Sequence, residues 1–222
     1  MTRPRRRSLG WTFQRKLHPE GCVVVAGVDE VGRGCWAGPV YAAAAILPDG
    51  FKHRHLHDSK LVEAECRAEL SAFLCSHPDV AWAIGIASLE EIEVHNILRA
   101  SLLAMRRAVA ALKVQPHLCL IDGHMKAGLA CREVTVIKGD ARCPSIAAAS
   151  VIAKVARDRA MRELAALYPH YGFENHKGYG TPEHQHALAL HGPSSIHRRT
   201  FKPVRCHAGA EAGDDGGDRE LW

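Results

Sequence analysis

Four acidic side chains lie at or just beyond the carboxyl ends of three apolar, strand-like runs. Asp29 and Glu30 follow VVVAGV, Asp122 follows HLCLI, and Asp140 follows VTVIKG. In open α/β sheets, ligands bind at the carboxyl ends of the strands. If these three strands are neighbours and run in the same direction, their carboxylates converge on one patch.

A turn is the alternative interpretation for each acid taken alone. An Asp-Gly pair after a strand commonly forms a turn, and this is the better interpretation of Asp122 or Asp140 by itself. Asp29 and Glu30 are adjacent, so both reach one site only if the strand end twists or bulges. Taken together, however, clustered carboxylates repel one another, and at least one would be driven toward protonation.

Divalent cations would remove this repulsion. Carboxylate oxygens favour Mg²⁺ or Mn²⁺ over Zn²⁺. Two such ions about 4 Å apart activate a water molecule and stabilise the leaving oxygen in phosphodiester hydrolysis. The four acids therefore predict a two-metal hydrolytic site, with the acids as ligands.

The elements that must position these acids alternate along the chain. We predict an α/β fold with a mixed five-stranded sheet flanked by helices, in which the first three strands form an antiparallel meander and the later strands are parallel. The predicted strands are 22–28, a segment within 36–47, 80–88, 117–122 and 132–137. The predicted helices are 58–77 with Ser59 as its cap, 89–112, 144–168, and 181–192 capped by Thr181.

Composition and charge limit the class of protein. Of the 222 residues, 47% are hydrophobic, which is enough for one globular domain, placed at 21–206. A basic arm (1–20) and an acidic, Gly-rich tail (207–222) are expected to be disordered. The apolar runs are too short to span a membrane and no secretory signal is visible, so we expect a cytoplasmic protein. The eight cysteines contain no C-x-x-C pair and are expected to be reduced.

The net charge of +5 is compatible with a polyanionic partner. A basic cluster near the carboxyl end could contact a phosphate backbone or form a solvated face. Its members are His197, Arg198, Arg199 and Lys202. Three residues of the helix 144–168 are interpreted as structural, with Lys154 or Arg157 available to pair with an acid; the third is Asp158.

The ordered set of motifs resembles the ribonuclease HII family. The resemblance extends from about Val23 to Val204 and rests on AGVDEVGRG, WAGPV, DSK, HNIL, IDG, KGD, AAASVIAKVARDR, YGFENHKGYGTPEHQ and HGPSSIHRRTFKPV. It implies a ribonuclease H-like fold. It also implies an endonuclease that cuts RNA in duplex with DNA, including a single ribonucleotide embedded in DNA. Cleavage is implied on the 5′ side of the ribonucleotide, leaving 3′-hydroxyl and 5′-phosphate ends.

The resemblance also implies roles for individual residues. The four acids occupy the positions of the catalytic and metal-binding residues of the family, with Mn²⁺ or Mg²⁺ as the cofactor and two ions when substrate is bound. Gly32, Arg33 and Gly34 occupy the loop that recognises the ribonucleotide 2′-hydroxyl, and Tyr179 occupies the tyrosine beside the same sugar. After DSK the family usually has a second lysine, whereas Leu61 stands here. Lys60 is therefore interpreted either as a phosphate contact or as a solvated residue at the start of a helix.

Three alternatives remain at this point. Another acid-quartet nuclease, such as an exonuclease, would share the carboxylates without needing the Gly-Arg-Gly loop. Ribonuclease HIII typically carries an extra N-terminal domain, for which the residues before Val23 are too few. A non-catalytic, basic nucleic-acid-binding protein would explain the basic clusters but not acids facing a polyanion. We expect a monomer with RNA–DNA hybrids and ribonucleotide-containing DNA as partners and no membrane association.

Overall fold

The computed structural model describes residues 10–17, 24–56 and 63–207. Five strands form one sheet in the order β3-β2-β1-β4-β5. β1 is antiparallel to β2, and β2 is antiparallel to β3, whereas β1, β4 and β5 run parallel. The predicted meander followed by parallel strands is confirmed. The strands are β1 (Val25–Val31), β2 (Val40–Ile46), β3 (Ala81–Ala87), β4 (Leu118–Asp122) and β5 (Arg132–Val136).

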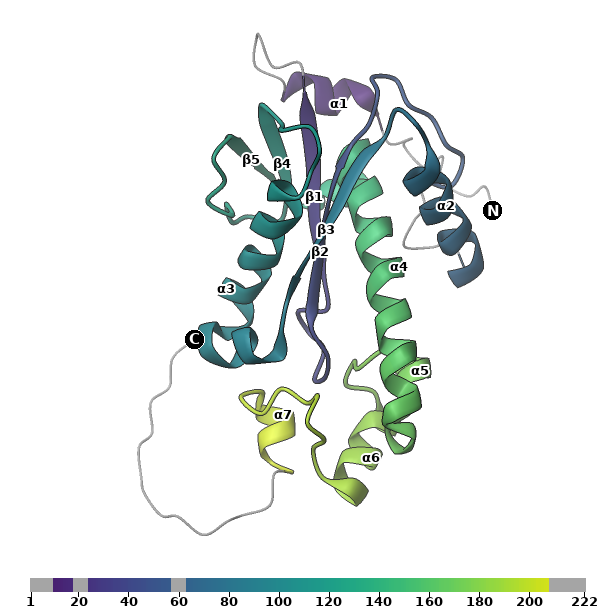
Figure 1. Cartoon of the computed structure of the whole chain (residues 1–222), viewed down its shortest axis with the longest axis vertical. Helices are drawn as coiled ribbons and strands as arrows, with labels where there is room; N and C mark the ends of the chain where they lie inside the picture. Colours follow the sequence, from purple (N-terminus) through teal and green to yellow (C-terminus); the bar gives the residue numbers. More distant parts are fainter. Residues whose placement is uncertain (1–9, 18–23, 57–62, 208–222) are drawn as a thin grey trace, which may run out of the picture.

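Helices cover both faces of the sheet (Figure 1). Helix α3 (Leu89–Ala110) packs on one face, and α4 (Pro144–Leu167) packs on the other beside α2 (Ala64–Ser76). On each face of the sheet, a strand has a glycine at the point where the helix backbone approaches it closely. A Cβ on Gly27 would lie 2.1 Å from the backbone of α4, and one on Gly85 would lie 2.1 Å from the backbone of α3. These contacts fix the two helices against the strands that carry the predicted site.

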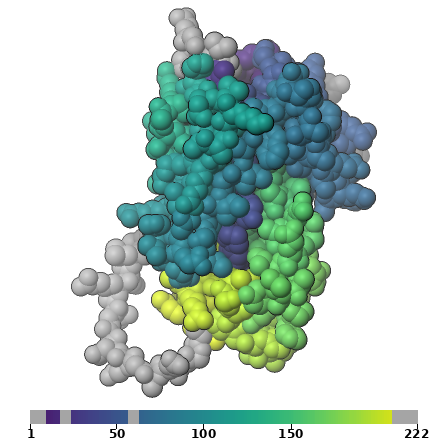
Figure 2. Space-filling model, in the orientation of Figure 1, coloured from purple at the N-terminus to yellow at the C-terminus, as the bar shows by residue number. Residues whose placement is uncertain are grey.

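A smaller group of helices extends the molecule below the carboxyl end of β1 (Figure 1). It contains α5 (Phe173–His176), α6 (Pro182–His191) and α7 (Lys202–Arg205). Figure 2 shows this carboxyl-terminal part, in yellow and green, packed against α3 and against the lower half of α4. Its own apolar cluster includes the fully buried Phe173.

Helix α1 (Trp11–Lys16) lies inside the arm expected to be disordered, and for these residues the expectation was wrong. Trp11 donates from Nε1 to the backbone oxygen of Phe51 at 2.8 Å. Buried Gln14 accepts from the backbone N–H and the hydroxyl of Ser145 at 3.1 and 3.0 Å. Trp11 and Gln14 are three residues apart and therefore share one face of the helix. The many basic residues around them made the whole arm resemble a disordered segment.

The other predicted helices are confirmed, with one shorter than expected. Helix α2 begins at Ala64, with Glu63 as its N-cap, instead of at residue 58. The predicted cap Ser59 and the binding residue Lys60 lie outside the described residues. Among the helices that the structure describes, none is both long and apolar enough to cross a membrane.

Candidate active site

The parallel pairing of β1 with β4 brings Asp29 and Asp122 to one edge of the sheet. The strand register places them side by side, one residue beyond the last pair of the ladder. Asp140 lies in the short turn η2 (Gly139–Ala141), just after the next parallel strand, β5. Carboxylates from three distant segments therefore meet where the sequence predicted.

A cavity of about 400 Å³ opens at this edge. Three of the predicted carboxylates line it, namely Asp29, Glu30 and Asp122, whereas Asp140 is buried at 7% exposure and is not part of the wall. The wall also contains the predicted substrate-binding residues Gly32, Arg33, Gly34 and Tyr179, together with Lys154.

Asp29 carries the strongest electrostatic conflict in this cavity. Its pKa is raised well above the usual value, first by burial and then by the negative charges of Glu30 and Asp122. Asp140 adds to the repulsion, so all four carboxylates share one environment. A hydrogen bond with Ser150 opposes the shift. A bound cation would relieve this conflict, because it favours the charged form of every carboxylate around it.

The carboxylates hold other partners in this structure. Arg33 Nη1 lies 3.0 Å from Glu30 Oε1, and the Gly139 N–H donates to Asp122 Oδ1 at 2.6 Å. Within the described ranges, no three His, Cys, Asp or Glu side chains are already arranged around a single ion. The donor set still fits a hard divalent cation, because it consists of carboxylate oxygens. Arg33 contacts one oxygen of Glu30, so the other oxygen can reach a cation.

The Gly-Arg-Gly loop is held against α4 at Gly32. This residue has a φ of +96°, which favours glycine, and a Cβ there would lie 2.2 Å from Arg157 Nε. Arg157 is fully buried and donates to the backbone oxygens of Pro39, Ala37 and Lys177 at 3.1, 3.1 and 3.0 Å. Arg157 therefore braces the loops around the cavity through carbonyl groups, instead of pairing with an acid as the sequence had suggested.

A second buried guanidinium braces the same loop. Arg198 is fully buried and donates from Nη1 to the backbone oxygen of Arg33 at 3.0 Å. It also donates from Nε and Nη2 to the oxygen of Gly38 at 3.0 and 2.8 Å. Sequence reasoning missed this role. The signal it could have used is the flanking Ile196 and Phe201, which pack into the carboxyl-terminal apolar cluster.

The sequence indicated either a phosphate contact or a solvated face for the basic cluster, and both interpretations were wrong for two of its members. His197 is 3% exposed and Arg198 is inaccessible, so neither contacts a phosphate backbone nor forms a solvated face. Arg199 and Lys202 are exposed and remain available to a polyanion.

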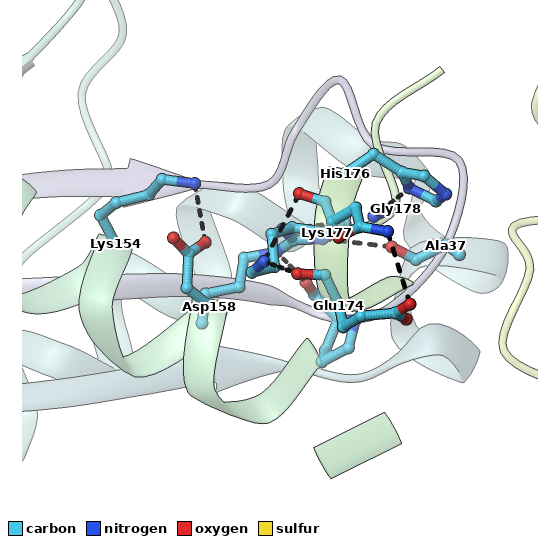
Figure 3. Close-up of polar contacts among 10 residues, drawn as sticks. Ala37, Lys154, Asp158, Glu174, His176, Lys177 and Gly178 are labelled. Atoms are coloured by element: carbon cyan, nitrogen blue, oxygen red, sulfur yellow. Dashed lines mark hydrogen bonds and ion pairs between the residues drawn. The ribbon is translucent and has the colours of Figure 1, made fainter. Parts of the chain in front are cut away.

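Tyr179 stands beside the Gly-Arg-Gly loop, because its backbone pairs with Cys35 in an isolated antiparallel bridge. Burial and then the neighbouring Cys35 raise the pKa of Tyr179 to about 12, so its hydroxyl keeps its proton at neutral pH. The Nζ of Lys154 lies 5.5 Å from the centre of the tyrosine ring. Lys154 also pairs with Asp158 at 2.7 Å, one turn along α4 (Figure 3). The cavity therefore has a carboxylate side and a side with a protonated phenol and an ammonium group.

The family model described as ribonuclease HII matches residues 26–204, a range that includes every predicted site residue. The chain belongs to the ribonuclease HII family. A ribonuclease HII from Bordetella pertussis is 50% identical to it over 184 residues, covering 83% of this chain and 91% of the relative.

Solved structures agree with this assignment to the ribonuclease HII family. The ribonuclease H2 of Pyrococcus horikoshii superposes with a TM-score of 0.72 at 26% identity, covering 84% of this chain and 97% of the other. A Bst ribonuclease HIII solved in complex with Mn²⁺ gives a TM-score of 0.62 at 17% identity, covering 84% and 70%. The second likeness concerns the fold alone. The predicted ribonuclease H-like fold is confirmed.

As a ribonuclease HII, the protein is a metal-dependent endonuclease that hydrolyses the RNA strand of RNA–DNA hybrids. The activity expected from the motifs is confirmed at this level. The alternatives of a purely binding protein and of an exonuclease do not agree with this family assignment.

Proposed function

We propose that this ribonuclease HII also cuts duplex DNA at a single embedded ribonucleotide, on its 5′ side, leaving 3′-hydroxyl and 5′-phosphate ends. One observation carries the proposal: three of the four carboxylates, the Gly-Arg-Gly loop and Tyr179 line the same cavity. The 2′-hydroxyl distinguishes RNA from DNA. Groups that recognise one sugar beside the cleavage site can therefore act on a single ribonucleotide, without a longer stretch of RNA.

The proposed metal ligands are Asp29, Glu30, Asp122 and Asp140, holding Mg²⁺ or Mn²⁺, with two ions present when substrate is bound. The all-oxygen donor set and the raised pKa of Asp29 support this assignment. When bound, the ions supply Lewis acidity at the scissile phosphate. Asp140 would act from behind the cavity wall, since it is the one of the four that does not line the cavity.

The side chains around the carboxylates are proposed to orient the substrate. Gly32 and Gly34 leave the loop backbone open to the 2′-hydroxyl, because neither carries a Cβ. The protonated hydroxyl of Tyr179 can donate a hydrogen bond, and its ring is 38% exposed and can pack against the sugar. Lys154 lines the same wall and adds positive charge for a phosphate. Lys60 stays a proposed phosphate contact outside the described residues.

The metal assignment is tested by Asp29→Asn, which keeps the shape of the side chain and removes its charge. We expect loss of cleavage with binding to the duplex retained, because the substitution removes a proposed ligand and not a proposed nucleic-acid contact. Asp79→Asn is the matched control, since Asp79 is exposed and outside this cavity. Unchanged cleavage by Asp29→Asn, measured with a labelled RNA–DNA hybrid, would overturn the assignment.

The proposal also includes a monomeric enzyme that acts in the cytoplasm. Its relative from Bordetella pertussis is bacterial, and bacterial chromosomal DNA, the proposed substrate, lies in that compartment. Light scattering at micromolar concentration tests the monomer: a mass near 24.3 kDa is expected, and twice that mass would contradict it.

A further inference from the structure

Three histidines lie beneath the loop that carries Tyr179, and the proposed function gives none of them a role. His184 on α6 is inaccessible, and His197 is 3% exposed. The ring of His176, at the end of α5, stacks on that of His184 with centroids 4.5 Å apart. His184 and His197 meet at 3.0 Å through their Nε2 atoms. Two buried imidazoles in direct contact require a defined arrangement of protons.

Backbone groups at both ends determine that arrangement. The Ser194 N–H donates to His197 Nδ1 at 2.9 Å, so Nδ1 is an acceptor and the proton of the neutral ring is on Nε2. His197 Nε2 therefore donates to His184 Nε2. The proton of His184 is then on Nδ1, which lies 2.9 Å from the backbone oxygen of Tyr179, an atom that can only accept. All the hydrogen bonds point in one direction, from Ser194 to Tyr179.

The Ser194 hydroxyl and His176 agree with this order. The hydroxyl of Ser194 lies 2.8 Å from His197 Nδ1 and donates to it as well. His176 Nδ1 accepts from the Gly178 N–H at 3.1 Å, and its Nε2 donates to the oxygen of Tyr171 at 2.7 Å. His184 and His197 are thus neutral, and each has one tautomer. Protonation of His184 or His197 would place two N–H groups against each other.

These bonds hold the peptide groups on both sides of Tyr179. Its oxygen accepts from His184 and from the Thr181 N–H, each at 2.9 Å, and its own N–H donates to the His176 oxygen at 2.9 Å. The preceding Gly178, labelled beside His176 in Figure 3, accepts at its oxygen from the Trp36 N–H at 2.8 Å. Since both peptide planes are fixed, the direction in which the tyrosine side chain leaves the backbone is fixed too.

We propose that His184 and His197 are positioning residues for substrate recognition, which hold the backbone of Tyr179 so that its ring faces the Gly32–Gly34 loop. Neither histidine lines the cavity, so they act through Tyr179. The inference rests on the proposed role of Tyr179 beside the ribonucleotide sugar. A packing role alone would bury the two rings but would not depend on which nitrogen donates.

Two amide substitutions separate positioning from packing. In His184→Asn the amide nitrogen can take the place of Nδ1 and still donate to Tyr179. In His184→Gln the amide reaches the place of Nε2, and the donor to Tyr179 is lost. We expect His184→Gln to raise KM for a duplex with one ribonucleotide by about 2- to 12-fold, the range of one lost hydrogen bond, with a smaller rise for His184→Asn.

A packing role predicts the opposite order, because asparagine leaves the larger cavity. A KM that rises more in His184→Asn than in His184→Gln would therefore overturn the proposal. His186→Gln, on the exposed side of the same helix, is the control for handling of the variants. If His184→Gln fails to fold, His197→Gln and His197→Leu replace the pair. Glutamine keeps the N–H donor toward His184, whereas leucine removes it, so His197→Leu should raise KM more than His197→Gln.

Repeating the pair in a Tyr179→Ala background separates this inference from the proposed function. If His184 acts through Tyr179, His184→Gln should have no further effect on KM once the ring is removed. A full, additive effect of His184→Gln in that background would overturn the positioning role while leaving the role of Tyr179 intact. No effect of Tyr179→Ala on KM would overturn the role of Tyr179 and the positioning proposal with it.

Discussion

Acid should destabilise this protein steeply, because two buried histidines stay neutral in the folded state. Burial lowers the pKa of His184 to about 4 and that of His197 to about 3, against about 6.5 in an unfolded chain. Between these values the unfolded chain binds more protons than the folded one. The free energy of unfolding therefore falls as the pH falls below about 6.5.

The size of the effect follows from the two shifts. Within the window, each histidine contributes about 1.4 kcal/mol per pH unit. Between pH 7 and pH 5 each should lower the free energy of unfolding by about 2 kcal/mol, and the pair by about 4 kcal/mol. A typical domain has a total stability of about 5–15 kcal/mol, so this loss is large enough to measure.

Urea unfolding at a series of pH values from 7 to 4.5 tests this. The wild type is compared with His197→Gln, which should reduce the fall in the free energy of unfolding between pH 6 and pH 5 by about 1 kcal/mol. His186→Gln, which removes an exposed histidine of α6, should leave the wild-type dependence unchanged. Identical dependences for the wild type and His197→Gln would refute the reasoning, because His197 would then bind protons equally in both states.

Two further predictions concern the loop and the acids. Gly32→Ala should lower the free energy of unfolding by about 3 kcal/mol, because alanine disfavours the positive φ and its Cβ would displace Arg157 from at least one charge-assisted hydrogen bond. A loss under about 1 kcal/mol in urea unfolding would contradict a rigid contact between Gly32 and Arg157. Without metal, Asp29→Asn should raise stability by about 1 kcal/mol by removing repulsion, and it should weaken the thermal stabilisation that Mg²⁺ gives the wild type. A lower metal-free stability would argue against repulsion among the carboxylates.

The elements of the fold were predictable where local pattern and packing agree. The five apolar runs and helix α3 follow from periodicity, and α6 follows from its cap Thr181. The order of strands and helices along the chain indicated a meander followed by parallel strands. Helix α1 was missed because its anchor, Gln14, finds its partner Ser145 131 residues away. A break inside α3 was missed too: Asn96 has a φ of 68°, and its Oδ1 accepts from the N–H groups of Leu98 and Arg99.

The meeting of the acids was predictable for the same reason as the sheet. Parallel neighbouring strands end at one edge, so acids at their carboxyl ends must meet. The side-chain partners were not predictable, because they depend on contacts between distant segments. Arg198 donates to the oxygen of Arg33, which is 165 residues away in the sequence. Because Arg198 stands between a histidine and another arginine, the sequence alone favours a surface position for it. The direction of the bonds from His197 to Tyr179 likewise exists only in the folded chain.

The most direct measurement is cleavage of an end-labelled DNA duplex that carries one internal ribonucleotide. The reaction is run with Mg²⁺, with Mn²⁺ and with a chelator, beside an all-DNA duplex. We expect a single metal-dependent cut on the 5′ side of the ribonucleotide, with the all-DNA duplex intact. No cut at the ribonucleotide under conditions in which a long RNA–DNA hybrid is cleaved would contradict the claim that this cavity recognises a single sugar.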